Sequence, residues 1–372
     1  MKNYKTFTMY VTCGTSILTN ACKTDPDVSE VLKRNSNKKT EGEINPSDKR
    51  IIDELYLKQM DIWGNKTEDE VEKSSAELKC FLFWIKKNKV SKEKISIILL
   101  HTDTVFGDYT SELIKEWLEK YGCIVLENKR IQNLNAERIG DFEKGLSELA
   151  RWTFSSTKEH QSESNNVIFN VAGGFKSVSG FMQMVGQVCA DEIVYIYEGE
   201  DSEVLSIPKL PFEWNDTKAI EEHFDDYRRL SLELPAKNPV ELNYLWVSGD
   251  SLSPWGVIVW EAAKKKIYKQ KLFPSVYNGV ILGADLEGSV QKGYDYSDVN
   301  ERIDDLVRYL QSCRKINPGL LHYRAIAGKH DCTHECNVNG NVSTERLFCI
   351  EQNGKIIVQK IGDALHKTRQ TT

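Results

Sequence analysis

The sequence predicts two domains: an α/β domain with a parallel, Rossmann-like sheet, then a small α+β domain with an antiparallel sheet. Short apolar runs alternate with amphipathic helices over about the first 200 residues, which is typical of parallel βαβ units. Near the end, one amphipathic helix precedes three strand-like segments, as in an antiparallel meander. The length of 372 residues also exceeds what one core usually holds.

The first domain is assigned to residues 1–235, which end in a stretch punctuated by prolines. Its strands are predicted at residues 7–11, 94–100, 123–127, 167–171 and 192–197. Its helices are predicted at residues 68–87, 111–121 and 141–154, each with an apolar stripe at helical spacing. Residues 23–50 are polar and predict an exposed excursion or a short surface helix.

Residues 236–274 predict a connector with a basic helix at 261–271, and residues 275–372 form the second domain. In that domain we expect a helix at 297–312, capped by Ser297. Asn353-Gly354 is a strong signal for a hairpin between the last two strands. The strands are predicted at residues 280–284, 333–338, 346–350 and 355–361.

Composition excludes several classes of protein. No apolar run approaches the about 20 residues of a membrane helix, and nine cysteines without a scaffold spacing indicate reduced thiols. We therefore expect a cytoplasmic protein with no membrane contact. The formal net charge is −6, and residues 240–372 carry 17 basic against 15 acidic residues. Bulk charge would therefore not bring the chain to nucleic acid.

Three polar loops, residues 13–20, 101–108 and 172–177, follow strands of the predicted sheet. Ligands of such sheets bind at these carboxyl ends. Glycines let the backbone approach a phosphate and hydroxyls donate hydrogen bonds, although each glycine motif alone fits a tight turn equally well. The candidate ligand-binding residues are Gly14, Thr15, Ser16, Thr19, Thr102, Asp103, Thr104, Ala172, Gly173, Gly174, Phe175 and Lys176.

Two of these loops resemble the motifs of CRISPR-associated Rossmann fold (CARF) domains. The matching segments are residues 11–20 (VTCGTSILTN) and 170–176 (NVAGGFK), and residues 190–198 with 207–211 are also similar. The resemblance spans about residues 5–215 and is nearest to the branch that includes ring nucleases. Ala172 stands where that branch often has Thr, so a hydroxyl contact is expected to be missing there.

The resemblance implies a homodimer that binds a cyclic oligoadenylate, the messenger of type III CRISPR complexes, across its two-fold axis. A two-fold site suits an even-numbered ring, which favours cyclic tetra-adenylate. The positions that match Ser16 and Lys176 orient and stabilise ring cleavage in the ring-nuclease branch. Whether this chain cleaves the ring or only binds it stays open.

The second domain carries residue types suited to RNA cleavage without a metal. That reaction needs a base, an acid and cations, and histidine can serve either proton role near neutral pH. The candidates are His330, His334 and His366, with Lys329, Arg324 and Arg346. The alternative is a zinc site, because His330, Cys332, His334 and Cys336 would share one face of a strand. One flat strand wraps a tetrahedral ion poorly, so no metal is expected.

Residues 333–338, 346–351 and 355–362 resemble the β-meander of the RelE/ParE toxin superfamily. The YafQ-like branch, with a similar His-Glu-Cys strand at 334–336, is nearest. Two features depart from it: residues 342–345 replace an acidic-Trp pair, and His366 lies farther from Gly362 than the family's C-terminal histidine lies from its glycine. The resemblance implies cleavage of mRNA in the ribosomal A site.

These observations lead to one principal hypothesis and two alternatives. The principal hypothesis is a ribosome-dependent mRNA endoribonuclease with no cofactor, activated by a cyclic oligoadenylate. Because the net charge is negative, we expect it to reach the ribosome through a protein contact, for example with the factor-recruiting stalk. The alternatives are a ring nuclease with a non-catalytic C-terminal regulator, and a nucleotide-responsive transcription factor that uses the basic helix at 261–271.

Overall fold

The computed structural model divides the chain into two compact units, Met1–Phe212 and Glu213–Thr372. The boundary lies earlier than the expected residue 235. The structure describes residues 6–22, 24–162, 164–197, 203–210, 217–239, 242, 246–326, 331–339 and 344–364. Among these residues, no helix combines the length and the hydropathy that crossing a membrane requires.

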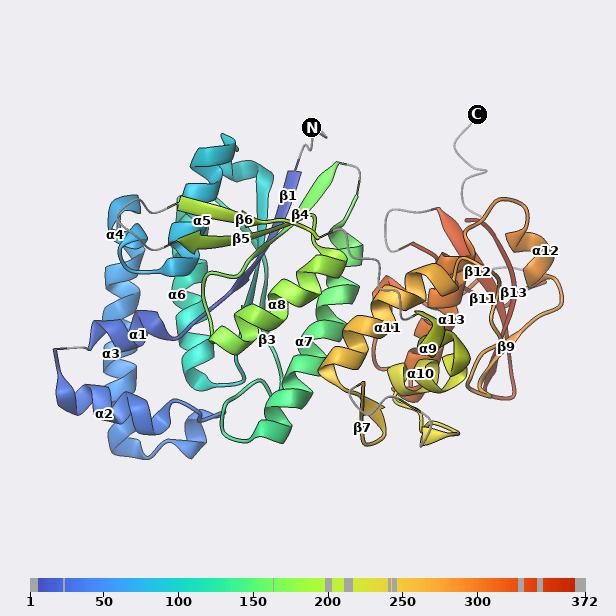
Figure 1. Cartoon of the computed structure of the whole chain (residues 1–372), viewed down its shortest axis with the longest axis horizontal. Coiled ribbons are helices and arrows are strands. Elements are labelled where there is room, and N and C mark those ends of the chain that lie inside the picture. Colours follow the sequence, from blue (N-terminus) through green and yellow to red (C-terminus); the bar gives the residue numbers. More distant parts are fainter. Residues whose placement is uncertain are drawn as a thin grey trace. The chain divides into compact units, whose positions relative to one another are not determined.

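The first unit contains a six-stranded sheet in the order β3-β2-β1-β4-β5-β6 (Figure 1). The first five strands are parallel, and β6 runs antiparallel to β5. The strand order reverses between β1 and β4, where ligands of such sheets bind. The strands are β1 (Thr6–Thr12), β2 (Ile95–His101), β3 (Ile124–Arg130), β4 (Asn165–Asn170), β5 (Glu192–Tyr197) and β6 (Glu203–Ile207).

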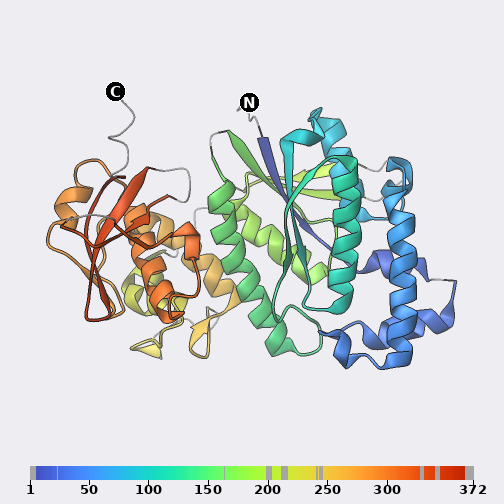
Figure 2. The same cartoon turned by 180° about the vertical axis from the view of Figure 1, so that it is seen from behind.

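Helices cover both faces of this sheet (Figures 1 and 2), which confirms the predicted α/β class. The expected excursion at residues 23–50 contains α2 and the beginning of α3. The helices are α1 (Ser16–Ala21), α2 (Pro26–Asn35), α3 (Pro46–Gly64), α4 (Glu68–Glu72), α5 (Ala76–Asn88), α6 (Val105–Tyr121), α7 (Ile139–His160) and α8 (Lys176–Cys189). Short 3₁₀ turns lie at Glu41–Glu43 and Lys92–Lys94.

The prediction of one continuous helix at 68–87 is wrong, because the chain breaks between α4 and α5. Thr67 caps α4 through a capping box, and Ser75 caps α5 by accepting a hydrogen bond from the backbone N–H of Leu78 at 3.2 Å. The predicted helix at 111–121 begins earlier, at Val105, because Thr104 caps it by accepting from Gly107 N–H at 3.0 Å.

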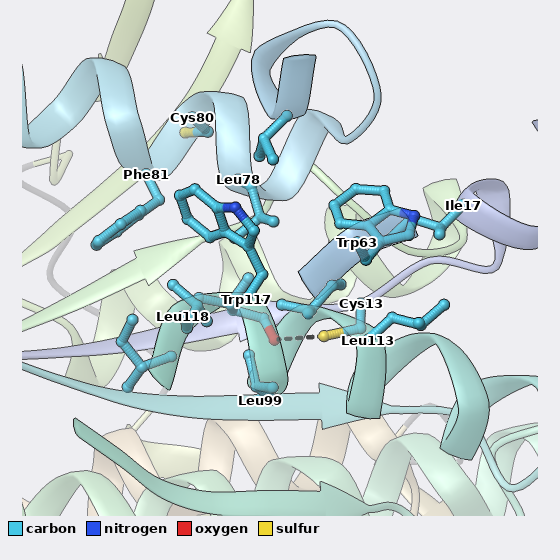
Figure 3. Packing of buried hydrophobic residues seen from close by; sticks show 14 of the residues in the cluster. Cys13, Ile17, Trp63, Leu78, Cys80, Phe81, Leu99, Leu113, Trp117 and Leu118 are labelled. Atoms are coloured by element: carbon cyan, nitrogen blue, oxygen red, sulfur yellow. Dashed lines mark hydrogen bonds between the residues drawn. The ribbon is translucent and has the colours of Figure 1, made fainter. Parts of the chain in front are cut away.

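Alternate side chains of β1 pack on opposite faces of the sheet. Met9 and Val11 belong to a buried apolar cluster that includes Trp63 and Trp117 and is drawn in part in Figure 3. On the other face, the Tyr10 hydroxyl lies 2.8 Å from the hydroxyl of Ser156 in α7. Burial raises the pKa of Tyr10. The central strand is therefore fixed on both faces.

The second unit contains a separate five-stranded sheet in the order β10-β11-β12-β13-β9. Its pairs are antiparallel except β13 with β9, which are parallel. The predicted hairpin forms at Asn353 and Gly354, whose φ angles are 54° and 74°. The strands are β9 (Val280–Leu282), β10 (Arg324–Ala325), β11 (His334–Asn337), β12 (Glu345–Gln352) and β13 (Lys355–Asp363).

One face of this sheet packs on α12 (Leu286–Val290) and α13 (Tyr296–Gln311) through a buried apolar cluster. Asp295 caps α13 in place of the expected Ser297, since the Asp295 side chain accepts from the Ser297 backbone N–H at 2.7 Å. The unit also contains α9 (Thr217–Glu222), α10 (Phe224–Ser231), α11 (Pro254–Ile267), a small hairpin of β7 (Val247–Ser248) and β8 (Ser251–Leu252), and a 3₁₀ turn at Pro318–Leu320.

The predicted connector and the helices just before it, including α10, belong to the second unit. Arg228 of α10 forms a buried ion pair with Asp304 of α13 at 2.7 Å, and the Tyr268 hydroxyl donates to the same carboxylate. The expected basic helix is α11, which ends at Ile267, and its Lys264 is buried beside Glu261 at 2.6 Å. Residues of the connector therefore complete the core of the second unit.

Candidate functional site

A hollow of about 250 Å³ opens at the carboxyl edge of the first sheet, at the point where the strand order reverses. The loops after β1 and β4, one residue after β2, and the first turn of α5 line it. The structure brings nine of the twelve candidate ligand-binding residues to this hollow: Gly14, Thr15, Ser16, Thr19, Thr102, Ala172, Gly173, Gly174 and Phe175.

The other three candidates have different surroundings. Asp103 is buried and accepts hydrogen bonds from Arg130 at 2.8 Å and from the Asn133 N–H at 2.9 Å. Burial alone would raise the pKa of Asp103, but these hydrogen bonds together with the charges of Arg130 and Lys39 outweigh burial and lower that pKa. Thr104 caps α6. Lys176 is the exposed first residue of α8, directly after Phe175 at the rim of the hollow.

The glycines of the two loops pack against each other and against a carboxylate. A Cβ on Gly14 would lie 2.9 Å from the backbone nitrogen of Gly174, whose φ is +87°. A Cβ on Gly173 would lie 2.2 Å from the side-chain carbons of Glu77. The Gly173 carbonyl accepts a hydrogen bond from the Thr12 hydroxyl at 2.7 Å. Close packing therefore requires glycine at these positions.

Glu77, which the sequence analysis missed, forms part of the floor of the hollow. Its side chain is only 1% exposed. One carboxylate oxygen accepts from the Gly14 backbone N–H at 2.7 Å, and the other accepts from the Ser75 hydroxyl at 2.8 Å. The backbone carbonyl of Glu77 accepts from the Asn170 amide at 2.8 Å. Glu77 thus joins α5 to the ends of both β1 and β4.

Only a weak signal in the sequence pointed to this carboxylate. Ser75 followed by Glu77 fits a helix start, with a capping hydroxyl and an acidic first turn. Apolar residues keep helical spacing from Val71 to Leu78, Leu82 and Ile85, and this spacing concealed that start. Nothing local to Glu77 indicates a partner at Gly14, because the two residues meet only through the fold.

The electrostatic character of the hollow follows from Glu77. Burial, and then the charge of Glu77, raise the pKa of the Cys13 thiol well above its usual value. Among the described residues that line the hollow, none is Lys or Arg. Hydroxyl groups of Thr15, Ser16 and Thr102 and the ring of Phe175 complete the lining. The hollow therefore combines one buried carboxylate with uncharged walls that are partly polar and partly apolar.

In the second unit, His334 lies in a cluster of polar and aromatic groups. Its ring stacks on Tyr323, with centroids 5.0 Å apart, and its Nε2 lies 3.5 Å from a Glu351 carboxylate oxygen. Arg314 also binds Glu351, and hydrogen bonding from Arg314 lowers the pKa of that carboxyl. Lys329, His330 and His366 lie outside the described residues.

The two candidate arginines lie on the opposite face of the sheet from His334. Cross-strand partners share a face, and successive residues alternate. Arg324 pairs with Glu335 and donates to its carboxylate at 2.7 and 2.9 Å. Arg346 pairs with Asn337, two residues farther along the same strand as Glu335. The structure therefore brings Arg324 and Arg346 to one face, and places His334 on the other.

The zinc alternative has no support in the described residues, where no group of three or more His, Cys, Asp or Glu side chains could hold a metal ion. The regular strand begins at His334, so Cys332 lies outside it. Cys336 is fully buried in the apolar cluster under α13. His330, the fourth proposed ligand, is outside the described part of the chain.

The first unit has a match among known protein families. Residues 72–210 match the family of CRISPR-associated proteins described as Cas_APE2256, a family that contains CARF domains. The match includes Glu77, strands β2 to β6 and the glycine loop after β4, but not the loop after β1 or the second unit. It supports the expected association with CRISPR systems.

Proposed function

From this CRISPR association of residues 72–210, we propose that the first unit binds a cyclic oligoadenylate and that binding activates an mRNA endoribonuclease in the second unit. The observation that carries the proposal is the hollow at the switch point. Two glycine loops, distant in sequence, meet there with nine of the residues expected to contact the ligand. Such a crevice is where open α/β sheets bind nucleotides.

The ligand is a ring of nucleotides rather than one mononucleotide. The hollow is small, about 250 Å³, and open to one side, so it takes one part of a larger ligand. A homodimer would place two such hollows around a two-fold axis, which suits an even-numbered ring. Cyclic tetra-adenylate is therefore the proposed activator.

The second unit supplies groups for RNA cleavage. His334, held beside Glu351, can exchange a proton with RNA, and Arg324 and Arg346 carry positive charge on the opposite face of the sheet. These groups lie on two faces, so the ribosome would complete the geometry by holding the mRNA. A protein contact, such as one with the ribosomal stalk, would offset the chain's net charge of −6.

The test adds purified protein to translating ribosomes with cyclic tri-, tetra- or hexa-adenylate, and maps mRNA ends by primer extension. We expect cleavage only when ribosomes and cyclic tetra-adenylate are both present. His334→Ala should reduce the rate about 100-fold or more, because general acid–base groups contribute that much. His322→Ala, which changes an exposed histidine of the same unit, should leave the rate unchanged.

Two results would contradict this proposal in different ways. Cleavage that proceeds at the same rate without any ring would exclude control by the first unit. Cleavage of free RNA but not of ribosome-bound mRNA would exclude the ribosome as the site of action.

A second candidate, a ring nuclease whose second unit is a non-catalytic regulator, is favoured by one observation. Ser16 is exposed at the hollow and Lys176 is exposed at its rim, whereas the candidate ribonuclease groups lie on two faces. In the same assay this candidate would show loss of cyclic tetra-adenylate over time with intact mRNA. Ser16→Ala and Lys176→Ala would then each stop the loss of the ring.

A further inference from the structure

The two nitrogens of the His334 imidazole have different partners. Nε2 lies 3.5 Å from a carboxylate oxygen of Glu351, and Nδ1 lies 3.0 Å from the hydroxyl oxygen of Thr333. Glu351 reaches Nε2 because His334 pairs with Cys349 across the sheet, and Glu351 stands two residues farther along β12 on the same face. A carboxylate, an imidazole and a hydroxyl in this order form the arrangement in which histidine takes a proton from a hydroxyl.

The Glu351 carboxylate is held in place by groups other than His334. Arg314 donates to its two oxygens at 2.5 and 3.2 Å, and the Tyr323 hydroxyl donates at 3.5 Å. The hydrogen bonds from Arg314 lower the pKa of Glu351, so the group is ionised near neutral pH. The backbone N–H of Glu351 also donates to the Thr333 hydroxyl oxygen at 3.0 Å. A fixed, negatively charged carboxylate therefore faces Nε2.

These contacts select one tautomer of the neutral imidazole. An ionised carboxylate only accepts hydrogen bonds, so it attracts a proton on Nε2 and would repel a lone pair there. Nδ1 is then the acceptor, and the Thr333 hydroxyl is its donor. The imidazole also stacks on Tyr323 with an angle of 4° between the planes, which limits its rotation. The lone pair that can take a proton is therefore on Nδ1.

The Thr333 hydroxyl can leave Nδ1 without losing its other hydrogen bonds. Its oxygen also lies 3.5 Å from the backbone carbonyl of Cys349, which is a second acceptor for the hydroxyl hydrogen. In either orientation the oxygen still accepts from the Glu351 N–H. Thr333 is exposed, and the His334 side chain is 24% exposed. A hydroxyl group of RNA can therefore take the place of Thr333 at Nδ1.

We propose that Nδ1 of His334 is the general base of RNA cleavage and that Glu351, held by Arg314, positions it. Nδ1 takes the proton of a ribose 2′-hydroxyl, whose oxygen bonds to the adjacent phosphorus while the bond from phosphorus to the 5′-oxygen breaks. The departing 5′-oxygen takes a proton from water, and the imidazolium returns its proton to the solvent. The inference rests on the proposed function, because it assigns roles within that reaction.

The first test concerns the tautomer and needs no cleavage activity. The full chain is labelled with nitrogen-15 histidine, and the signals of His334 are those that His334→Ala lacks. At alkaline pH, where the imidazole is neutral, the nitrogen chemical shifts should place the proton on Nε2. A proton on Nδ1 would overturn the inference, because Nδ1 would then have no lone pair with which to act as a base.

The second test is a double-mutant cycle in the assay with translating ribosomes and cyclic tetra-adenylate. Glu351→Gln can still accept from Arg314 but loses the charge that faces Nε2. We expect kcat to fall about 10- to 100-fold, because a misdirected general base loses much of its effect, with KM changed less than about threefold. In a His334→Ala background the same change should lower kcat by no more than about twofold, because Glu351 acts through His334.

Glu287→Gln is the matched control for this substitution. Glu287 is an exposed carboxylate of the same unit that accepts from the Tyr296 hydroxyl at 2.9 Å. The same chemical change there should leave kcat and KM unchanged. The tautomer of the wild type keeps the inference testable if Glu351→Gln does not fold.

The outcomes distinguish the inference from the proposed function. If the wild type cleaves mRNA and His334→Ala does not, but Glu351→Gln keeps the wild-type kcat, the role of Glu351 is overturned and the proposed function stands. An equal fall in kcat with and without His334 would show that Glu351 acts independently of it, and would also overturn the inference. If the wild type cleaves no mRNA with any cyclic oligoadenylate, the proposed function fails and the inference fails with it.

Discussion

At the scale of single residues, Gly173 has less room for a side chain than Gly14 or Gly174, the other glycines of the hollow. In Gly173→Ala the new Cβ would lie 2.2 Å from the side chain of Glu77. Glu77 cannot move away without breaking its hydrogen bond to Gly14. We expect the first unit to lose about 1–3 kcal/mol of unfolding free energy, the usual cost of overpacking. Urea unfolding measures this loss.

Gly180→Ala is the matched control for this substitution. Gly180 is an exposed glycine of α8, and a Cβ there meets nothing within 4 Å. The same chemical change should therefore stabilise the helix, by up to about 1 kcal/mol. A Gly173→Ala protein as stable as the wild type would mean that the loops can separate from Glu77 at no cost.

At this scale, the sequence predicted the positions of the site glycines correctly, but it did not predict why glycine is required there. The sequence marked Gly14, Gly173 and Gly174 because glycine pairs after strands are conspicuous. It could not show that they enclose Glu77, since 63 residues separate Glu77 from Gly14. Asp103 shows the converse: it stands in a loop that meets the site, but its carboxylate is bound to Arg130.

At the scale of the secondary-structure elements, the start of α5 positions the floor of the hollow. The Ser75 hydroxyl donates to Glu77 at 2.8 Å, and its oxygen accepts from the Leu78 N–H. Ser75→Ala should cost about 1 kcal/mol of stability, as loss of a helix cap does. It should also weaken binding of cyclic tetra-adenylate several-fold, because Glu77 loses a partner. Denaturation and titration calorimetry measure the two effects.

Thr67→Ala removes the cap of the neighbouring helix α4, where the Thr67 side chain bonds to Glu70. We expect a similar loss of stability with unchanged affinity for the ring. Equal affinities for the two variants would show that the cap of α5 has no special role in the site.

Elements with a strong local pattern were predicted to within a few residues, and those set by distant contacts were not. The strand at 192–197 matches β5 in full, and the Asn353-Gly354 hairpin forms as expected. The break before α5 was missed because the apolar stripe continues across it. The parallel pairing of β9 with β13 has no local signal, since Val280 meets Ile356.

At the scale of the whole molecule, the buried pair of Arg228 and Asp304 ties α10, which the sequence analysis assigned to the first domain, to the core of the second unit. Both side chains are at most 4% exposed and bond at 2.7 Å. Asp304→Ala would leave a buried guanidinium without its carboxylate, so we expect a loss of about 3–5 kcal/mol in that unit. Calorimetry of the full chain should show one shifted transition, with ring binding by the first unit unchanged.

Glu222→Ala provides the control, because its pair with Lys218 is exposed and 3.9 Å long. Its effect should stay below about 0.5 kcal/mol. An Asp304→Ala protein with an unchanged melting profile would mean that the pair with Arg228 does not hold α10 in the core of the second unit.

The number of domains followed from length and from the change in pattern, whereas their boundary did not. Prolines near residue 235 suggested a linker, yet the division lies between Phe212 and Glu213. Composition could not show that α10 and Tyr268 share a carboxylate of α13. Local sequence features such as prolines indicate where the chain turns. They do not indicate which hydrophobic core a segment joins, because that depends on tertiary contacts.

The position of β13 between β12 and β9 has a consequence for how the protein is made. A ribosome releases the chain from its N-terminal side, and domains fold as they emerge. All strands of the first sheet precede residue 208, whereas the second sheet lacks its interior strand until residues 355–363 appear. The nascent polypeptide can therefore complete the sheet of the first unit while the sheet of the second unit is still unfinished, so the first unit can fold before the second.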